Sequence, residues 1–282
     1  MSELARILRL MSVAAAAAVA LLAVSPPARA QAPQAKPEMT ESCPGLIARE
    51  TPRVIPAAFR MAALAADQVR ITYIGHSTFL LESPQLVRVA TDYNDYVQPP
   101  VLPDIVTMNH AHSTHYTLNP DPKIPHVLHG WREDGKPARI DLQVKDTRVR
   151  NVPTNIRSWG GGTEYNGNSI FIFEMGNLCI AHLGHLHHTL TQQQLNEIGR
   201  VDVVMVPVDG GVTLDLDGMV EVLQSLKAPL MIPMHYFSTF TLQRFLDRVK
   251  EKYAVEFNET PSIVVSKATL PASPKFLVLP GR

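Results

Sequence analysis

Short runs of apolar and β-branched residues recur along the chain from residue 69 onward, and turns rich in Gly, Pro, Asn and Asp separate them. Runs of this kind between turn signals are typical of buried β-strands. They predict extensive β-sheet in this part of the chain. The expected strands cover residues 69–74, 79–82, 86–91, 104–108, 143–152, 169–174, 178–181, 203–208, 230–233 and 263–265.

Helical signals are fewer and concentrate after residue 190. Thr191 and Gln194 have the spacing of a capping box, and Gly199 follows as a stop signal, so a short helix is expected between them. A strand-rich first half, followed by helices between strands, favours an α/β protein in which helices cover the outer faces of layered sheets. Two more segments keep a helical hydrophobic period, through Met219, Val220, Leu223 and Leu226 and through Leu242, Phe245, Leu246 and Val249.

The first 30 residues have the pattern of a secretory signal peptide. Arg6 and Arg9 precede an apolar stretch over residues 11–24, and Ala28-Arg29-Ala30 has the small-x-small form of a cleavage site. The apolar stretch is shorter than the about 20 residues that a membrane-spanning helix needs. We therefore expect a periplasmic or secreted protein with no membrane span after cleavage.

The mature chain is expected to fold as one domain. A Pro-rich lead-in segment over residues 31–55 follows the signal peptide of residues 1–30, and the domain covers residues 56–282. The chain has 26 Lys and Arg against 26 Asp and Glu, which argues against nucleic acid as the partner and favours a small-molecule substrate. The sequence leaves the oligomeric state open.

Only two cysteines are present, so the chain is no disulfide scaffold and has no four-cysteine zinc site. Export would permit a disulfide between Cys43 and Cys179. Cys179 lies in an apolar run, where the pattern favours a buried small hydrophobic residue over a bonded cysteine.

Seven of the 11 histidines fall in two short windows, residues 110–115 and 182–188. In the first window, a predicted strand over residues 104–108 leads into His110-x-His112-x-x-His115. Strand alternation would point His110 and His112 the same way, so that both could bind one metal ion. His115 lies beyond them and could bind a second metal or a water molecule.

Two further predicted strands end near histidines, namely His185 after residues 178–181 and His235 after residues 230–233. Loops at strand ends can hold distant ligands around one site. Asp209 follows another strand and precedes Gly210-Gly211, so it is either a catalytic base or the cap of a turn. Three other histidines are expected to be ordinary core or surface residues, namely His126, His129 and His182.

Together these motifs resemble the metallo-β-lactamase superfamily, in particular its metal-dependent hydrolases related to ascorbate-phosphate lactonase. The resemblance implies a four-layer αβ/βα sandwich with metal at one edge. It also implies hydrolysis of an ester, lactone or phosphoester-like substrate by a metal-bound hydroxide. The matching segments, in family order, are residues 73–77, 104–115, 181–184, 207–211 and 233–236.

Three positions depart from the family pattern. Thr114 stands where the family has a metal-binding Asp, Ile156 where it has a His, and His185 where it has a bridging Asp. The loss of two carboxylates favours one ion over two, with Zn²⁺ as the first choice and Cu²⁺ or Ni²⁺ as alternatives. The expected ligands are His110, His112 and His185, with His235 or His115 as the fourth.

His115 or Asp209 is expected to act as the general base in place of the missing Asp, and His76 to support the site from behind the ligands. His187 and His188 are either close to the metal or an exposed pair. The segment over residues 159–168 is expected to be a flexible connection that places Trp159 near a pocket rim. An alternative function is also consistent with Thr114 and Ile156, namely a non-catalytic protein that binds or senses metal on the same scaffold.

Overall fold

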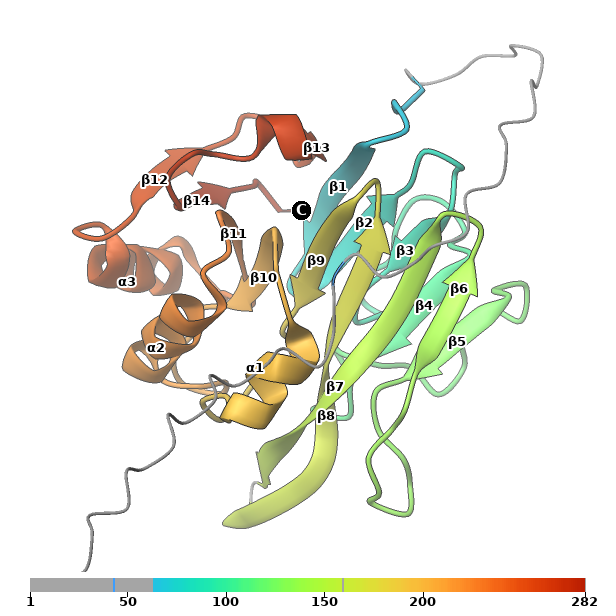
Figure 1. The fold of residues 1–282 in the computed structure, drawn as a ribbon. Coiled ribbons are helices and arrows are strands. Elements are labelled where there is room, and N and C mark those ends of the chain that lie inside the picture. Colours follow the sequence, from blue (N-terminus) through green and yellow to red (C-terminus); the bar gives the residue numbers. More distant parts are fainter. Residues whose placement is uncertain (1–42, 44–62, 159, 282) are drawn as a thin grey trace, which may run out of the picture. The chain divides into compact units, whose positions relative to one another are not determined.

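The computed structural model describes residues 43, 63–158 and 160–281. The predicted signal peptide, most of the lead-in segment and Trp159 lie outside these residues. Within them, two mixed β-sheets pack against each other (Figure 1). The first sheet has the strand order β13-β1-β2-β3-β4-β5. Its strands are β1 (Gln68–Gly75), β2 (Thr78–Glu82), β3 (Arg88–Ala90), β4 (Ile105–Met108), β5 (His126–His129) and β13 (Ser262–Ser266).

The second sheet has the order β12-β14-β11-β10-β9-β8-β7-β6. Strands β6 to β9 pair antiparallel, whereas β9, β10, β11, β14 and β12 run parallel. The carboxyl ends of the parallel strands therefore meet at one edge of this sheet. Its strands are β6 (Asp141–Val144), β7 (Thr147–Ser158), β8 (Gly162–Met175), β9 (Leu178–His182), β10 (Val203–Pro207), β11 (Leu230–Met234), β12 (Ala254–Phe257) and β14 (Lys275–Val278).

Three α-helices in the described residues cover the outer face of the second sheet (Figure 1). The capping box of Thr191 and Gln194 is present, and Gly199 caps the end of the first helix, as predicted. Apolar residues of the other two helices pack on the sheet, including Leu223 and Phe245. The helices are α1 (Gln192–Ile198), α2 (Leu216–Leu226) and α3 (Thr239–Val249).

Alternation along the strands divides the core into two layers. Ile172, Ala181 and Val204 face the helices, whereas their neighbours Phe173 and Ile180 pack with the first sheet. A smaller apolar group on the outside of the first sheet is covered by loop residues such as Trp131. The predicted α/β sandwich is confirmed, with the helices of the described residues on the second sheet.

The structure corrects two strand predictions. The run over residues 143–152 is not one strand, because the chain reverses at Lys145, which has a positive φ of 50°, and forms the β6–β7 hairpin. Residues 162–168 are not a flexible connection but the first half of β8, paired with β7 from Ser158 and Gly162 onward. Strands β5, β12 and β14 were not predicted.

Cys43 and Cys179 form a disulfide with an S–S distance of 2.03 Å. The prediction of an unbonded hydrophobic Cys179 is therefore wrong, although the residue is fully buried in the apolar layer under the helices. The bond spans 136 residues of sequence and ties residue 43 to β9.

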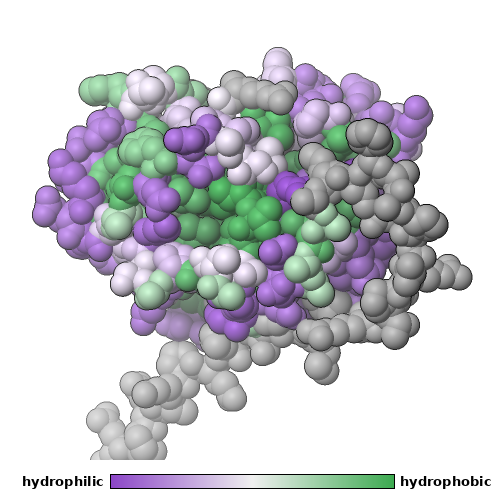
Figure 2. Space-filling view, turned by 90° about the horizontal axis from the view of Figure 1, so that it is seen from above, coloured by the Kyte–Doolittle hydropathy of each residue, from purple (hydrophilic) through white to green (hydrophobic). Residues whose placement is uncertain are grey.

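Hydrophobic residues gather in the middle of one face of the molecule and hydrophilic residues surround them (Figure 2). This face is the upper one in Figure 1. Among the described residues, no helix is long and apolar enough to cross a lipid bilayer.

Candidate metal centre

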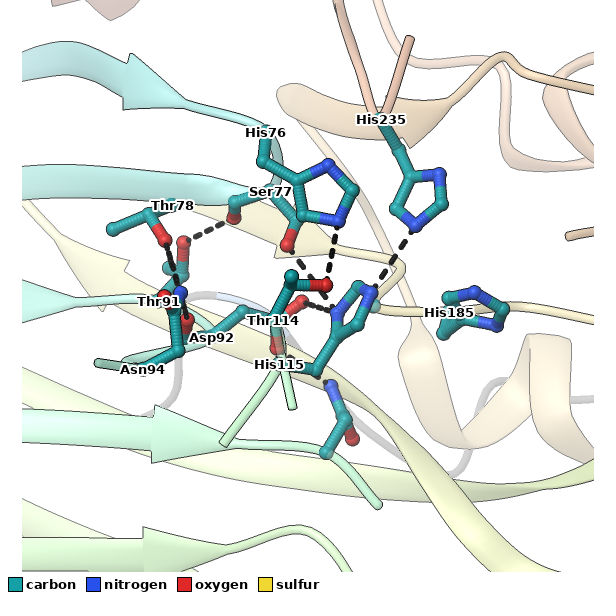
Figure 3. A network of polar contacts seen from close by, with 12 residues as sticks. His76, Ser77, Thr78, Thr91, Asp92, Asn94, Thr114, His115, His185 and His235 are labelled. Atoms are coloured by element: carbon teal, nitrogen blue, oxygen red, sulfur yellow. Dashed lines mark hydrogen bonds and ion pairs between the residues drawn. The ribbon is translucent and has the colours of Figure 1, made fainter. Parts of the chain in front are cut away.

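Four histidines come together at the carboxyl ends of strands from both sheets. They are His112 and His115 after β4, His185 after β9 and His235 after β11, and their ligand atoms all lie within 4.8 Å of one another. Figure 3 shows His115, His185 and His235 turned toward a common point, with His76 beside them. All four were predicted as metal ligands, and the structure brings them together.

Unusual backbone conformations place these side chains. His76 and His235 both have positive φ angles, of 50° and 56°, and the His235 N–H donates to the His76 carbonyl at 2.7 Å. Gly184 has a φ of 59°, and a Cβ there would lie 2.4 Å from Asn109 and Asn168. The Asn168 side chain in turn accepts a hydrogen bond from the His185 N–H at 2.7 Å.

Each of the four rings is held from behind at Nδ1. His115 Nδ1 lies 2.5 Å from Asp92 Oδ2, and His235 Nδ1 lies 3.0 Å from Asp209 Oδ2. His112 Nδ1 lies 2.8 Å from Thr114 Oγ1, and His185 Nδ1 lies 2.5 Å from His187 Nε2. Metal-binding histidines characteristically have such a partner on the other ring nitrogen, because it fixes the orientation of the ring.

The donor set fits a bound cation. A carboxylate only accepts hydrogen bonds, so Asp92 and Asp209 each accept one from the Nδ1–H of their histidine, which leaves the free lone pair of the ring on Nε2. These two lone pairs, on His115 and His235, face each other at 3.1 Å. A cation between them would remove their repulsion, and Zn–N bonds of ~2.0–2.1 Å in a tetrahedron imply a similar N···N distance of ~3.3 Å.

Burial favours the neutral form of three of these rings, which is the form that binds metal. Desolvation, with a smaller contribution from the neighbouring histidines, holds the pKa of His115 and of His185 well below the ordinary value. Desolvation also lowers the pKa of His112, and it lowers that of His76 to about 3. His76, His112, His115 and His185 are therefore uncharged at neutral pH.

Asp209 lies behind His235 and caps a turn. Its Oδ1 accepts hydrogen bonds from the backbone N–H of Gly211 at 2.8 Å and of Val212 at 2.7 Å. Burial alone would raise the pKa of Asp209, but hydrogen bonds from His235, Thr213 and the backbone outweigh it and lower the pKa. Of the two roles predicted for Asp209, this geometry matches the cap, and the residue also orients His235.

His110 does not join the other four, contrary to the expected ligand set. Strand β4 ends at Met108, so the alternation that would align His110 with His112 does not continue that far. His110 Nδ1 instead lies 2.6 Å from Glu164 Oε1. The His110 ring stacks on the Trp131 ring, with 5.1 Å between the ring centroids.

Thr114 and His187 connect the ligand group to its surroundings. Thr114 Oγ1 lies between His112 Nδ1 and His76 Nε2, the latter at 3.0 Å, which fits the supporting role expected of His76. His187 is buried against His185, whereas His188 is exposed, so the two do not act as a pair. Ile156 is buried in β7.

The remaining histidines lie outside the group. His182 is fully buried, and its Nε2 lies 2.8 Å from the Ser77 carbonyl oxygen. His126 and His129 belong to β5, where His129 packs against Trp131. All three are therefore core or surface residues, as predicted.

Sequence reasoning missed Asp92 and Phe237. Asp92 follows β3, is fully buried and also accepts a hydrogen bond from Asn109 at 3.0 Å. Its position after a predicted strand was the available signal, the same one that identified His235. Phe237 is 64 % exposed and its ring lies 5.4 Å from the His235 ring, so it presents an apolar surface beside the site.

Comparisons with known proteins give one family. The family model of the beta-lactamase superfamily domain matches residues 70–235. A metal-dependent hydrolase of Thermoplasma acidophilum is 29 % identical over 202 residues, which cover 63 % of this chain and 87 % of that protein.

Solved structures agree with this result. A proposed Zn-dependent hydrolase of the metallo-beta-lactamase superfamily from Thermotoga maritima shares 28 % identity and a TM-score of 0.55, covering 76 % of this chain and all of that one. Igni18, a metallo hydrolase of Ignicoccus hospitalis, shares the fold at 19 % identity and a TM-score of 0.52, covering 76 % and 97 % of the two chains.

The matched segment covers more than half of the 282 residues and contains all four clustered histidines together with Asp92 and Asp209. The resemblance to the metallo-β-lactamase superfamily is thus confirmed, while the closer resemblance to ascorbate-phosphate lactonase stays a prediction. The chain therefore belongs to the family described as the beta-lactamase superfamily domain.

Proposed function

We propose that the protein is an exported metal-dependent hydrolase that acts on a small ester, lactone or phosphoester-like substrate. The observation that carries the proposal is the 3.1 Å distance between His115 Nε2 and His235 Nε2, with the Nδ1 of each ring against a buried carboxylate. Relatives named metal-dependent hydrolases support the reaction class.

The residues of the chain have distinct parts in this function. The histidine group would hold the ion, and Asp92 and Asp209 orient two of its rings. A bound divalent ion would supply an activated water molecule and polarise a carbonyl or phosphoryl oxygen. Phe237 offers an apolar surface on which the non-reacting part of a substrate can pack.

The donors favour one ion, with Zn²⁺ as the first choice. The described residues contain one group of side chains that could hold a metal ion, and its donors are imidazole nitrogens alone. Zn²⁺ is commonly bound by imidazole, and Cu²⁺ or Ni²⁺ would also accept such ligands. The family carboxylates that favour a second ion are replaced by Thr114 and His185.

The test combines metal content with turnover. The mature protein should bind one Zn²⁺ per chain and hydrolyse at least one member of a panel of lactones, phosphodiesters and β-lactams. A chelator should abolish this activity and added metal should restore it. Absence of metal in protein that has been offered zinc would contradict the proposal, as would turnover that survives chelation.

A second candidate function is a metal-binding or sensing protein without catalysis. It is favoured by the number of imidazoles, because four nitrogen ligands would complete a tetrahedron and leave no position for water. Tight binding of one ion without hydrolysis of any panel member would select this function.

The disulfide supports export. Disulfides persist in oxidising compartments and are rare in the cytosol. Cys43 and Cys179 are bonded, and the amino-terminal sequence has the pattern of a signal peptide. Localisation of the native protein by cell fractionation tests the periplasmic or secreted destination, and recovery of the mature chain in the cytosol would refute it.

A further inference from the structure

The hydrogen bonds of His185 differ from those of the other three clustered histidines. His115 and His235 donate from Nδ1 to carboxylates, whereas the Nδ1 of His185 faces another imidazole, that of His187, at 2.5 Å. The direction of this last hydrogen bond decides which nitrogen of His185 carries the proton.

The backbone of β7 settles that direction. The Arg157 N–H donates to His187 Nδ1 at 2.8 Å, and a backbone amide can only donate. A ring nitrogen that accepts a hydrogen bond carries no proton, so the single proton of the His187 ring is on Nε2. His187 therefore donates to His185 Nδ1, and the proton of the neutral His185 ring is on its Nε2.

The next hydrogen bonds agree with this assignment. His185 Nε2 lies 3.1 Å from His112 Nε2, so its proton points into the histidine group and toward the lone pair of His112. His112 then carries its proton on Nδ1 and donates to Thr114 Oγ1 at 2.8 Å. The Thr114 hydroxyl donates onward to His76 Nε2 at 3.0 Å, so every contact from Arg157 to His76 joins one donor to one acceptor.

We propose that His185 is not a metal ligand but a fixed hydrogen-bond donor at the metal centre, with His112, His115 and His235 as the three protein ligands. The proposal rests on the proposed hydrolase function and deepens it. Three imidazoles leave the fourth position of a tetrahedral ion open, as catalytic zinc sites require. With an ion on the His112 lone pair, the Nε2–H of His185 would be free to donate to a substrate oxygen on which negative charge develops.

His187 is the positioning residue in this arrangement. Its ring, oriented by the Arg157 amide, imposes a tautomer on His185 that a carboxylate would reverse. In the variant His187→Glu, a carboxylate would accept a hydrogen bond from the Nδ1–H of His185, as Asp92 and Asp209 do from their histidines. His185 Nε2 would then become a bare lone pair and a fourth ligand.

X-ray absorption of the zinc-loaded protein tests the proposal by counting ligands. We expect three imidazoles and one oxygen in the wild type, the same count in His185→Gln, and four imidazoles in His187→Glu. Zinc affinity should change less than about tenfold in His185→Gln, and fall by more than that in the matched variants His115→Gln and His235→Gln. Four imidazoles in the wild type, with three in His185→Gln, would overturn the proposal.

Nitrogen NMR of the zinc-loaded wild type provides a second readout that needs no variant to fold. The expected spectrum shows a proton on Nε2 of His185 and none on Nε2 of His115 or His235. A metal-shifted, unprotonated Nε2 on His185 would refute the assignment. Neither readout depends on turnover, so the hydrolase proposal and this one fail separately.

Discussion

At the scale of single residues, the centre depends on which nitrogen of each imidazole is exposed to the ion. Asp92 and Asp209 come from the ends of β3 and β10, and each directs one histidine Nε2 toward the same point. The carboxylates are buried and act on the rings, so their contribution is to orientation and to ligand basicity.

Replacing Asp209 by Asn should weaken metal binding about 10- to 100-fold, because the amide no longer fixes the His235 tautomer. Competition with a chromophoric chelator measures the affinity. Asp217→Asn is the matched control, since Asp217 is exposed and pairs with Arg248. Equal metal affinities in the two variants would show that Asp209 only caps its turn and does not contribute to metal binding.

Phe237→Ala should raise KM for an apolar substrate about tenfold, since burial of a Phe side chain is worth about 1.5–3 kcal/mol, and leave kcat little changed. Phe240→Ala is the control, because Phe240 is 76 % exposed and the described contacts give it no histidine neighbour. Steady-state kinetics on the best panel substrate provides the values. An unchanged KM would remove Phe237 from the substrate-binding surface.

At the scale of elements, the site is built where parallel strands end. Strands β9, β10 and β11 deliver His185, Asp209 and His235 to one edge, and β3 and β4 deliver Asp92 and His115 from the other sheet. The turns after these strands are tight, and Gly184 occupies one of them in a conformation that favours glycine.

Gly184→Ala should lower the free energy of unfolding by about 1–3 kcal/mol, because the added Cβ meets Asn109 and Asn168 and the positive φ is unfavourable for alanine. Chemical denaturation of the metal-free protein measures the change. Gly160→Ala is the control, since a Cβ there has no atom within 4 Å, and it should change stability by less than about 0.5 kcal/mol. Equal stabilities would mean that the loop can shift to accept a side chain.

Most of the strands could be predicted from the sequence because buried strands carry uninterrupted apolar runs, as residues 178–181 do. The first half of β8 could not, because Thr163, Glu164 and Asn166 are polar and partly exposed and carry no strand period. His112, His185 and His235 were found because each follows an apolar strand. His110 was misplaced because the chain leaves the strand at Met108.

At the scale of the whole molecule, one disulfide connects distant parts of the described chain. The disulfide joins residue 43 to the second sheet across 136 residues of sequence, so it restricts the unfolded chain strongly. Loss of the disulfide should therefore lower the free energy of unfolding of the whole domain.

The double variant Cys43→Ala, Cys179→Ala should lose about 2–4 kcal/mol of unfolding free energy relative to the oxidised wild type. Urea denaturation with and without reductant checks this. Reductant should lower the stability of the wild type toward that of the variant and leave the variant unchanged. A wild type insensitive to reductant would mean that the bond contributes nothing to stability.

Acidification should destabilise the metal-free protein. The folded-state pKa values of His76, His112, His115 and His185 lie below the ordinary value of about 6.5, so the unfolded chain takes up protons that the folded rings exclude. The contribution of these histidines to the free energy of unfolding is therefore fully present above pH ~6.5. It decreases as the pH falls below that value toward the pKa values of the folded state. Denaturation midpoints between pH 8 and pH 5 measure this, and a midpoint that rises on acidification would contradict it.

The placement of the histidines on both sheets has a mechanical consequence. His115 follows a strand of the first sheet and His235 a strand of the second, so an ion held by both would cross-link the sheets at this end of the sandwich. Apolar contacts and hydrogen bonds, such as that between His182 Nε2 and the Ser77 carbonyl oxygen, also join the sheets. Metal loading should add to these connections, and amide hydrogen exchange in β4 and β11 should slow together.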